Sequence, residues 1–111
     1  MTLDQVIQNR KRASKKAGTI KGTIETRLKL DNDSSPRSTL LEVIAQDRPG
    51  LLYTIASMLV KHNCNIEIAL IDTEGQTTID VFYITSNGAK LVEEQCAFLQ
   101  HSLLKALQHE S

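Results

Sequence analysis

Aromatic residues and cysteines are scarce in this chain of 111 residues, which has no tryptophan, two tyrosines, two phenylalanines and two cysteines. Cys64 and Cys96 lie far apart and have no C-x-x-C spacing, so the sequence predicts buried structural thiols and neither a disulfide framework nor a metal site. His62, His101 and His109 are also scattered. Their positions indicate neither a set of metal ligands nor a nucleophile paired with a base.

Long apolar runs are absent as well. No run reaches the roughly 18 residues that a membrane span requires, and no signal-peptide pattern opens the chain. Hydrophobic residues make up 41% of the sequence, as in globular proteins. We therefore expect a cytoplasmic protein with no membrane partner. The length fits one domain with one core and leaves no room for a separate catalytic domain, so we expect no catalytic residues and no cofactor.

The net charge is zero, but the charges are unevenly distributed along the chain. Residues 1–38 contain nine Lys or Arg and four Asp or Glu, whereas residues 39–111 contain four and nine. This division predicts a basic leader joined to an acidic globular body. The leader could bind nucleic acid, or the opposite charges could come together within one fold or one dimer.

We expect residues 1–23 to be a leader and linker with a short basic helix, and residues 24–111 to be the folded domain. The basic cluster at Arg10–Lys16 has no interleaved aromatic residues, which favours a solvated helix face over a nucleic-acid site. The helix is too weakly apolar to form without tertiary contacts, so it is either mobile or docked on a neighbour. Its apolar face consists of Leu3, Val6 and Ile7.

Apolar residues recur at strand-like and helix-like spacing through the rest of the chain. Turn-forming residues separate the periodic segments. In the expected strand at Asn65–Ile71, we expect Ile66, Ile68 and Leu70 to point inward. The expected elements are a strand at Ile24–Leu30, a strand at Thr39–Gln46, a helix from Leu51 to a C-cap at Asn63, a strand at Asn65–Ile71, a strand at Thr77–Thr85, and a helix that buries Val92, Cys96, Leu99, Leu103 and Leu107.

This ββαββα order predicts an α+β, ferredoxin-like sandwich in which two helices pack on one face of a four-stranded antiparallel sheet. The usual βαββαβ unit closes with a strand after its second helix, and the sequence shows no such strand. We expect Ile24–Leu30 to occupy the vacant position beside Thr39–Gln46, because a hairpin reaches that position without a crossover.

The junction Asp47–Leu52, with the sequence D-R-P-G-L-L, joins the second strand to the first helix. Pro49 suits the first helical turn, and Gly50 would allow a ligand to approach the free N–H groups of the helix N-terminus. Those groups and the helix dipole favour a carboxylate or another anion. The alternative is an ordinary turn in which Asp47 caps the helix.

Several of these segments together resemble the ACT domain, a small regulatory module that binds amino acids in metabolic enzymes. The narrower resemblance, over roughly residues 24–107, is to the C-terminal ACT domain of PII-protein uridylyltransferase/uridylyl-removing enzymes, which act in bacterial nitrogen control. The segments that carry it are Thr26–Asp33, Thr39–Gln46, Asp47–Leu52, Asn65–Ile66 and Asp80–Thr85.

The resemblance implies a module that is non-catalytic by itself, because the nucleotidyltransferase and hydrolase motifs of those enzymes are absent from the sequence. It implies a small amino acid as ligand, with glutamine favoured, and a homodimer or pairing with another ACT domain. Many amino-acid-binding members have Asn where this chain has Asp47, which accepts hydrogen bonds but donates none when ionised. The implied ligand-binding residues are Asp47, Arg48, Pro49, Gly50, Leu51 and Leu52, with Asn65 and Ile66 of the paired domain opposite.

Two other functions remain open at this stage. An RNA-recognition domain shares the sheet topology, but the strand Thr77–Thr85 lacks the glycine and basic residues of that motif and contains Asp80, so nucleic acid is not the expected partner. A dimerisation module without a ligand is the second alternative.

Overall fold

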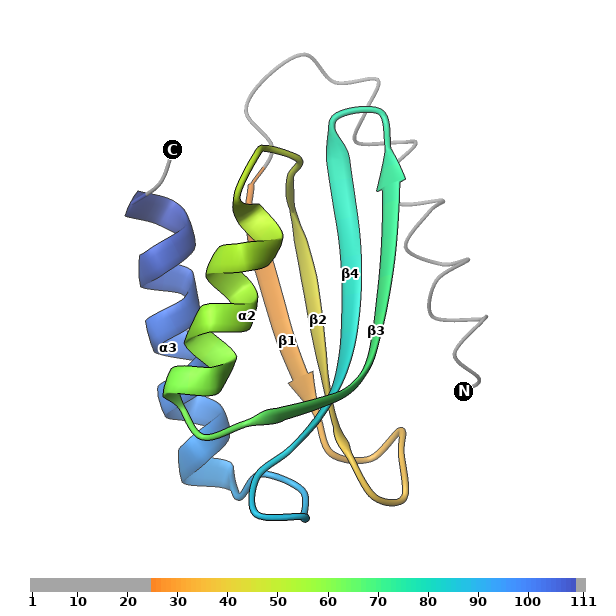
Figure 1. Cartoon of the computed structure of the whole chain (residues 1–111), viewed down its shortest axis with the longest axis vertical. Coiled ribbons are helices and arrows are strands. Elements are labelled where there is room, and N and C mark those ends of the chain that lie inside the picture. Colours follow the sequence, from red (N-terminus) through yellow and green to blue (C-terminus); the bar gives the residue numbers. More distant parts are fainter. Residues whose placement is uncertain (1–24, 110–111) are drawn as a thin grey trace.

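The computed structural model of the protein describes residues 25–109. The predicted basic leader and Ile24 lie outside the described residues. In the described part, a four-stranded antiparallel sheet carries two helices on one face (Figure 1), which confirms the predicted α+β class. Across the sheet the strands lie in the order β1-β2-β4-β3. Along the chain the elements are β1 (Arg27–Asp31), β2 (Thr39–Gln46), α2 (Leu51–Lys61), β3 (Asn65–Glu74), β4 (Thr77–Thr85) and α3 (Glu93–His109).

Strand β1 lies at the edge of the sheet and pairs antiparallel with β2, with Leu28 opposite Val43 and Leu30 opposite Leu41. Leu28 and Leu30 pack against the main core, while the exposed Arg27 and Lys29 point to the other face. The strand begins three residues later than Ile24. Charged side chains on its outer face discourage further pairing at this edge.

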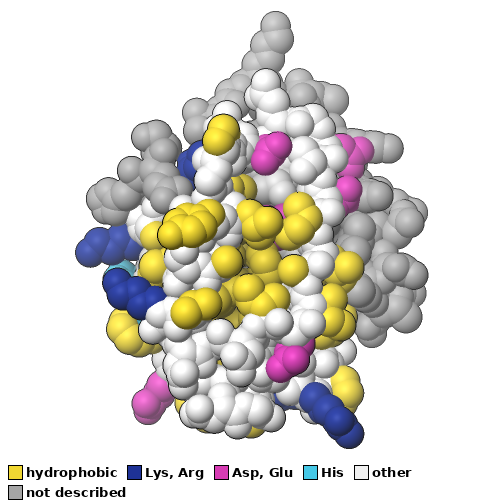
Figure 2. Space-filling model, viewed as in Figure 1, with side chains coloured by type: hydrophobic (Ala, Val, Ile, Leu, Met, Phe, Trp, Pro, Cys, Tyr) yellow, Lys and Arg dark blue, Asp and Glu magenta, His cyan; other side chains and the backbone are white. Residues whose placement is uncertain are grey.

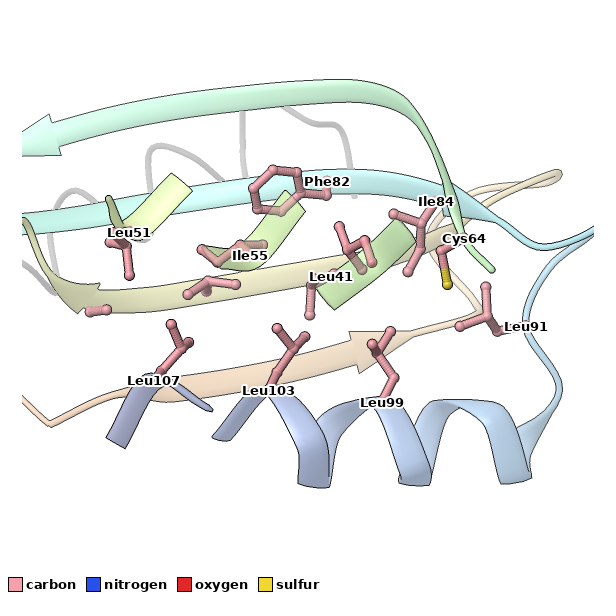
Figure 3. Close-up of a cluster of buried hydrophobic side chains, with 13 residues drawn as sticks. Leu41, Leu51, Ile55, Cys64, Phe82, Ile84, Leu91, Leu99, Leu103 and Leu107 are labelled. Atoms are coloured by element: carbon pink, nitrogen blue, oxygen red, sulfur yellow. The ribbon is translucent and has the colours of Figure 1, made fainter. Parts of the chain in front are cut away.

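The main core lies between the sheet and the two helices (Figure 3). Leu99, Leu103 and Leu107 recur every four residues along α3 and are 0%, 0% and 1% exposed. They meet Phe82 and Ile84 of β4 and, from α2, Ile55 and Leu59. Burial of each such side chain contributes about 1.5–3 kcal/mol, so these residues hold α3 against the sheet.

One predicted core position in α3 is wrong. Val92 is 61% exposed, and Leu91 takes the core position instead at 2% exposure. The reason is the start of the helix at Glu93, where the Val92 N–H donates to Oε1 of Gln95 at 2.9 Å. Val92 therefore precedes the helix, and its side chain turns outward.

The C-terminus of α2 fixes how the chain enters β3. Asn63 has a φ of 62°, as expected for a left-handed residue after the helix. Its N–H donates to Val60 at 2.9 Å, and the N–H of Cys64 donates to Leu59 at 2.8 Å. These two bonds complete the Schellman motif, so α2 stops at this point and β3 begins with Asn65.

The predicted inward orientation in β3 is also wrong for Ile68 and Leu70, which pair with Tyr83 and Val81 on the face away from the helices. Ile66 pairs with Ile84 and keeps to the helix face, but Ile66 and Ile68 are 37% and 47% exposed. A β-bulge between them interrupts the register with β4 and shifts the alternation of side chains. In addition, β3 is an edge strand, so its side chains have a neighbouring strand on one side only.

Candidate functional site

The junction between β2 and α2 is tied to the neighbouring hairpin turn. The backbone N–H of Asp47 donates to the carbonyl of Gln76 at 2.7 Å. Gln76 lies in the short turn between β3 and β4, directly before Thr77, which pairs with Gln46. Asp47 itself is an exposed residue at this end of the sheet. The position of Asp47 is therefore set by its backbone, and its side chain remains available.

The start of α2 differs from the predicted start. The helix begins at Leu51, and its N-cap is Gly50, which makes no side-chain cap and has a left-handed φ of 83°. Pro49 lies before the cap and not in the first turn, and Asp47 does not cap the helix. A Cβ added at Gly50 would meet no atom within 4 Å. The space beside Gly50 is thus open to an approaching group, and the cap residue supplies no side-chain acceptor to the N–H donors of the first turn. The N–H of Leu51 donates to the carbonyl of Arg48 at 3.3 Å.

Arg48 points away from this opening. Its Nη2 donates to the carbonyl of Leu107 at 2.8 Å, across 59 residues of sequence. The last carbonyls of a helix lack intrahelical donors and carry the negative end of the dipole, so a guanidinium is a favourable partner there. Among the predicted site residues, Arg48 is thereby a positioning residue that joins the junction to the end of α3.

A second carboxylate lies close to the junction, and the sequence analysis did not assign it to the site. Asp80 points to the helix face of the sheet, is 2% exposed, and accepts a hydrogen bond from Oγ1 of Thr78 at 2.7 Å. Burial raises the pKa of Asp80 above its ordinary value; the bond from Thr78 opposes this, and the charge of nearby Asp47 adds to it. Two acidic side chains therefore face one region beside the start of α2.

Asn65 and Ile66 lie at the opposite end of the same domain. Asn65 is paired with Thr85, whereas the junction adjoins Thr77. Eight residues of β4 separate these two pairing positions, a distance of about 26 Å at roughly 3.3 Å per residue. One domain therefore brings Asp47–Leu52 together but leaves the other two predicted residues remote.

An apolar strip connects the junction to β3. Figure 2 shows hydrophobic side chains gathered over α2 and the strands beside it, on the helix side of the molecule. The strip leads to the unpaired edge of β3, so an exposed apolar surface adjoins a row of free backbone groups. Its exposed members are Leu52 (47%), Tyr53 (77%), Val60 (70%), Ile66 (37%) and Ile71 (48%).

Two hollows on the described surface lie away from the junction. One of about 330 Å³ is lined by residues between the end of α2 and the start of α3, including Cys64 and Phe98. The ring of His62 meets Phe98 edge to face, with centroids 4.9 Å apart. A second hollow of about 290 Å³ lies between β1 and β2. Neither includes a residue of the junction.

The thiols behave as structural groups. Both cysteines are free, and burial raises the pKa of Cys64 and of Cys96. A raised pKa keeps a thiol protonated and poorly nucleophilic. Within residues 25–109, no three His, Cys, Asp or Glu side chains gather as metal ligands would. The helices described here are too short or too polar to cross a membrane.

Comparisons with known proteins agree with this architecture. Residues 27–111 match a family model described as "ACR9-like, ACT-like domain". Bifunctional uridylyltransferase/uridylyl-removing enzymes are similar to the chain: that of Stutzerimonas stutzeri (strain A1501) is 36% identical over 84 residues, which are 74% of this chain and 9% of the enzyme. That of Azospirillum brasilense is 38% identical over 86 residues, or 76% and 9%. The chain thus spans about a tenth of the length of these relatives.

Proposed function

The chain belongs to the ACT-like domain family, and we propose that it is the amino-acid-sensing module of a cytoplasmic, uridylyltransferase-like nitrogen-control protein. In this proposal the module is non-catalytic by itself and responds to glutamine. The observation that carries it is the open, uncapped start of α2 beside the carboxylates of Asp47 and Asp80. The helix N–H groups suit the carboxylate of a free amino acid, and the carboxylates of Asp47 and Asp80 suit its ammonium group.

The proposed site lies between two domains. Pairing of β3 with β3 of a second copy about a two-fold axis would satisfy the free edge and cover the apolar strip. Antiparallel strands run in opposite directions, so Asn65 of the partner would lie near the end of β3, beside the junction of the first domain. This explains how residues about 26 Å apart in one domain can serve one ligand.

Each part of a glutamine molecule has a partner of matching chemistry in such a site. The N–H groups at the start of α2 would hold the carboxylate, with the dipole favouring the negative charge. Asp47 would accept from the ammonium group, and Asp80 would add negative charge behind it. The Asn65 amide of the partner both donates and accepts, which complements a side-chain amide.

A ligand-free dimerisation module is the alternative. It is favoured by the positions of the two hollows, which do not include the junction, and by the presence of Asp47 in place of an amide. The apolar strip and the β3 edge would then serve pairing alone.

A thermal-shift screen against the twenty amino acids separates the two functions. A ligand at about 100 times its Kd stabilises the folded protein by roughly 2.7 kcal/mol, whereas a pairing module gains nothing from any amino acid. A shift for glutamine and no shift for its enantiomer would support the sensor. No shift with any amino acid would support the alternative.

Mixing two variants tests whether the site is shared. Asp47→Ala and Asn65→Ala each damage every site of their own homodimer. A mixed dimer has one intact site and one doubly damaged site, so random exchange should restore tight binding at about a quarter of the sites. Binding that stays weak after mixing would show that both residues do not act across the interface.

A further inference from the structure

The face of the sheet that points away from α2 and α3 is more buried than an open face would be. Side chains alternate along a strand, so Leu40, Ile79 and Val81 point away from the main core. They are nevertheless 2%, 1% and 0% exposed. Leu40 and Val81 form a separate apolar cluster with Leu70 and Tyr83. Among the described elements, both helices pack on the other face, so the cover of this cluster must come from beyond them.

This face is acidic on its β3 side. Asp72 and Glu74 point to it and are partly buried, and β4 beside them has no basic residue. Glu42 of β2 also faces this side, but Lys29 of β1 lies directly opposite it, so the net acidic charge lies toward β3. The carboxylates of Asp72 and Glu74 make the potential at this side of the face negative, which favours a positively charged neighbour. A fitting cover is therefore apolar over the centre of the sheet and basic toward β3.

We propose that residues 1–24 of this chain form that cover. The segment contains six Lys or Arg and one Asp, a net charge of +5, and residues 25–111 carry −5. Leu3, Val6 and Ile7 have the spacing of one helical face. The segment leads directly into β1, at the rim of the sheet.

The dimensions of the segment also fit. Fifteen helical residues would span about 22 Å, and four strands at roughly 4.8 Å spacing are no wider than that. The docked leader places its basic cluster opposite Asp72 and Glu74. It also covers the face that RNA-recognition domains use for stacking bases, including the partly buried ring of Tyr83.

Methyl NMR of the full chain with a soluble paramagnetic agent tests the proposal. In the wild type, the methyl groups of Ile79 and Val81 should be protected from the agent. Ile7→Asp places a charge in the apolar face of the leader and should remove that protection, while the methyl groups of Leu103 in the main core stay protected. Gln8→Asp is the matched control, because it adds the same charge at the next residue, and it should leave the protection intact.

Three results would overturn the proposal. The first is free access of the agent to Ile79 and Val81 in the wild type. The second is protection that survives both Ile7→Asp and Val6→Asp. The third is protection that disappears on dilution of the wild type, which would assign the cover to a second copy of the chain.

A second measurement does not depend on the leader variants being folded. Carbodiimide treatment of the wild type should link Lys15 or Lys16 to Asp72 or Glu74 within one chain. The absence of such links, with the other lysines reactive, would also contradict the proposal.

Discussion

Replacement of Arg48 by Met tests whether this residue positions the junction or contacts the ligand. Met retains most of the aliphatic stem and removes the guanidinium, and with it the 2.8 Å bond to the carbonyl of Leu107. Hydrogen bonds to charged groups contribute about 1.5–3 kcal/mol, and water can replace part of this at a helix end. We therefore expect Arg48→Met to lower the free energy of unfolding by about 1–2 kcal/mol, which is less than the full contribution of such a bond.

Urea denaturation measures this difference, and a loss of that size corresponds to a fall in Tm of roughly 5–10 °C for a domain of this length. Hydrogen exchange should also show faster opening in the last turn of α3. Lys105→Met is the control, since it removes a positive charge from an exposed residue of the same helix. If Arg48→Met were as stable as the control and instead weakened amino-acid binding, the positioning role would be refuted.

Two further outcomes follow from the same contacts. Because burial raises the pKa of Asp80, the folded protein binds the proton of this carboxyl more tightly than the unfolded chain does. The wild type should therefore match Asp80→Asn in free energy of unfolding at low pH and become less stable than this variant as pH rises through the raised pKa. Denaturation from pH 3 to 8 measures the difference, and a pH-independent difference would contradict the prediction. Ile71→Lys, in the exposed strip, should weaken self-association more than about tenfold, or about 1.4 kcal/mol, in sedimentation equilibrium. Val92→Lys should not, because Val92 lies outside the strip although it is more exposed, at 61% against 48% for Ile71.

Local sequence signals predicted the main elements because their causes are local. The alternation in β2 and β4 and the four-residue spacing of Leu99, Leu103 and Leu107 reflect the periods of strand and helix. Asn63 was predicted to end the first helix because asparagine accepts the left-handed conformation that most side chains avoid. These features need no knowledge of distant contacts.

The errors arose where a tertiary contact decides the outcome. The bulge in β3 turns Ile68 and Leu70 to the face away from the helices, and alternation alone cannot reveal an extra residue in one strand. Arg48 binds a carbonyl 59 residues away, so its local sequence carries no sign of that partner. Asp80 was missed as a site residue, although an acid within the inward-facing set of β4 was the available signal.

Titration calorimetry of glutamine binding to the full chain tests the central proposal most directly. The account predicts saturable binding of one glutamine per protomer to a folded, paired protein. It also predicts that Asp47→Ala binds at least about tenfold more weakly, because it loses a charge-assisted hydrogen bond of roughly 1.5–3 kcal/mol. No binding heat for glutamine or any other amino acid at millimolar concentration, in protein shown to be folded and dimeric, would contradict the account.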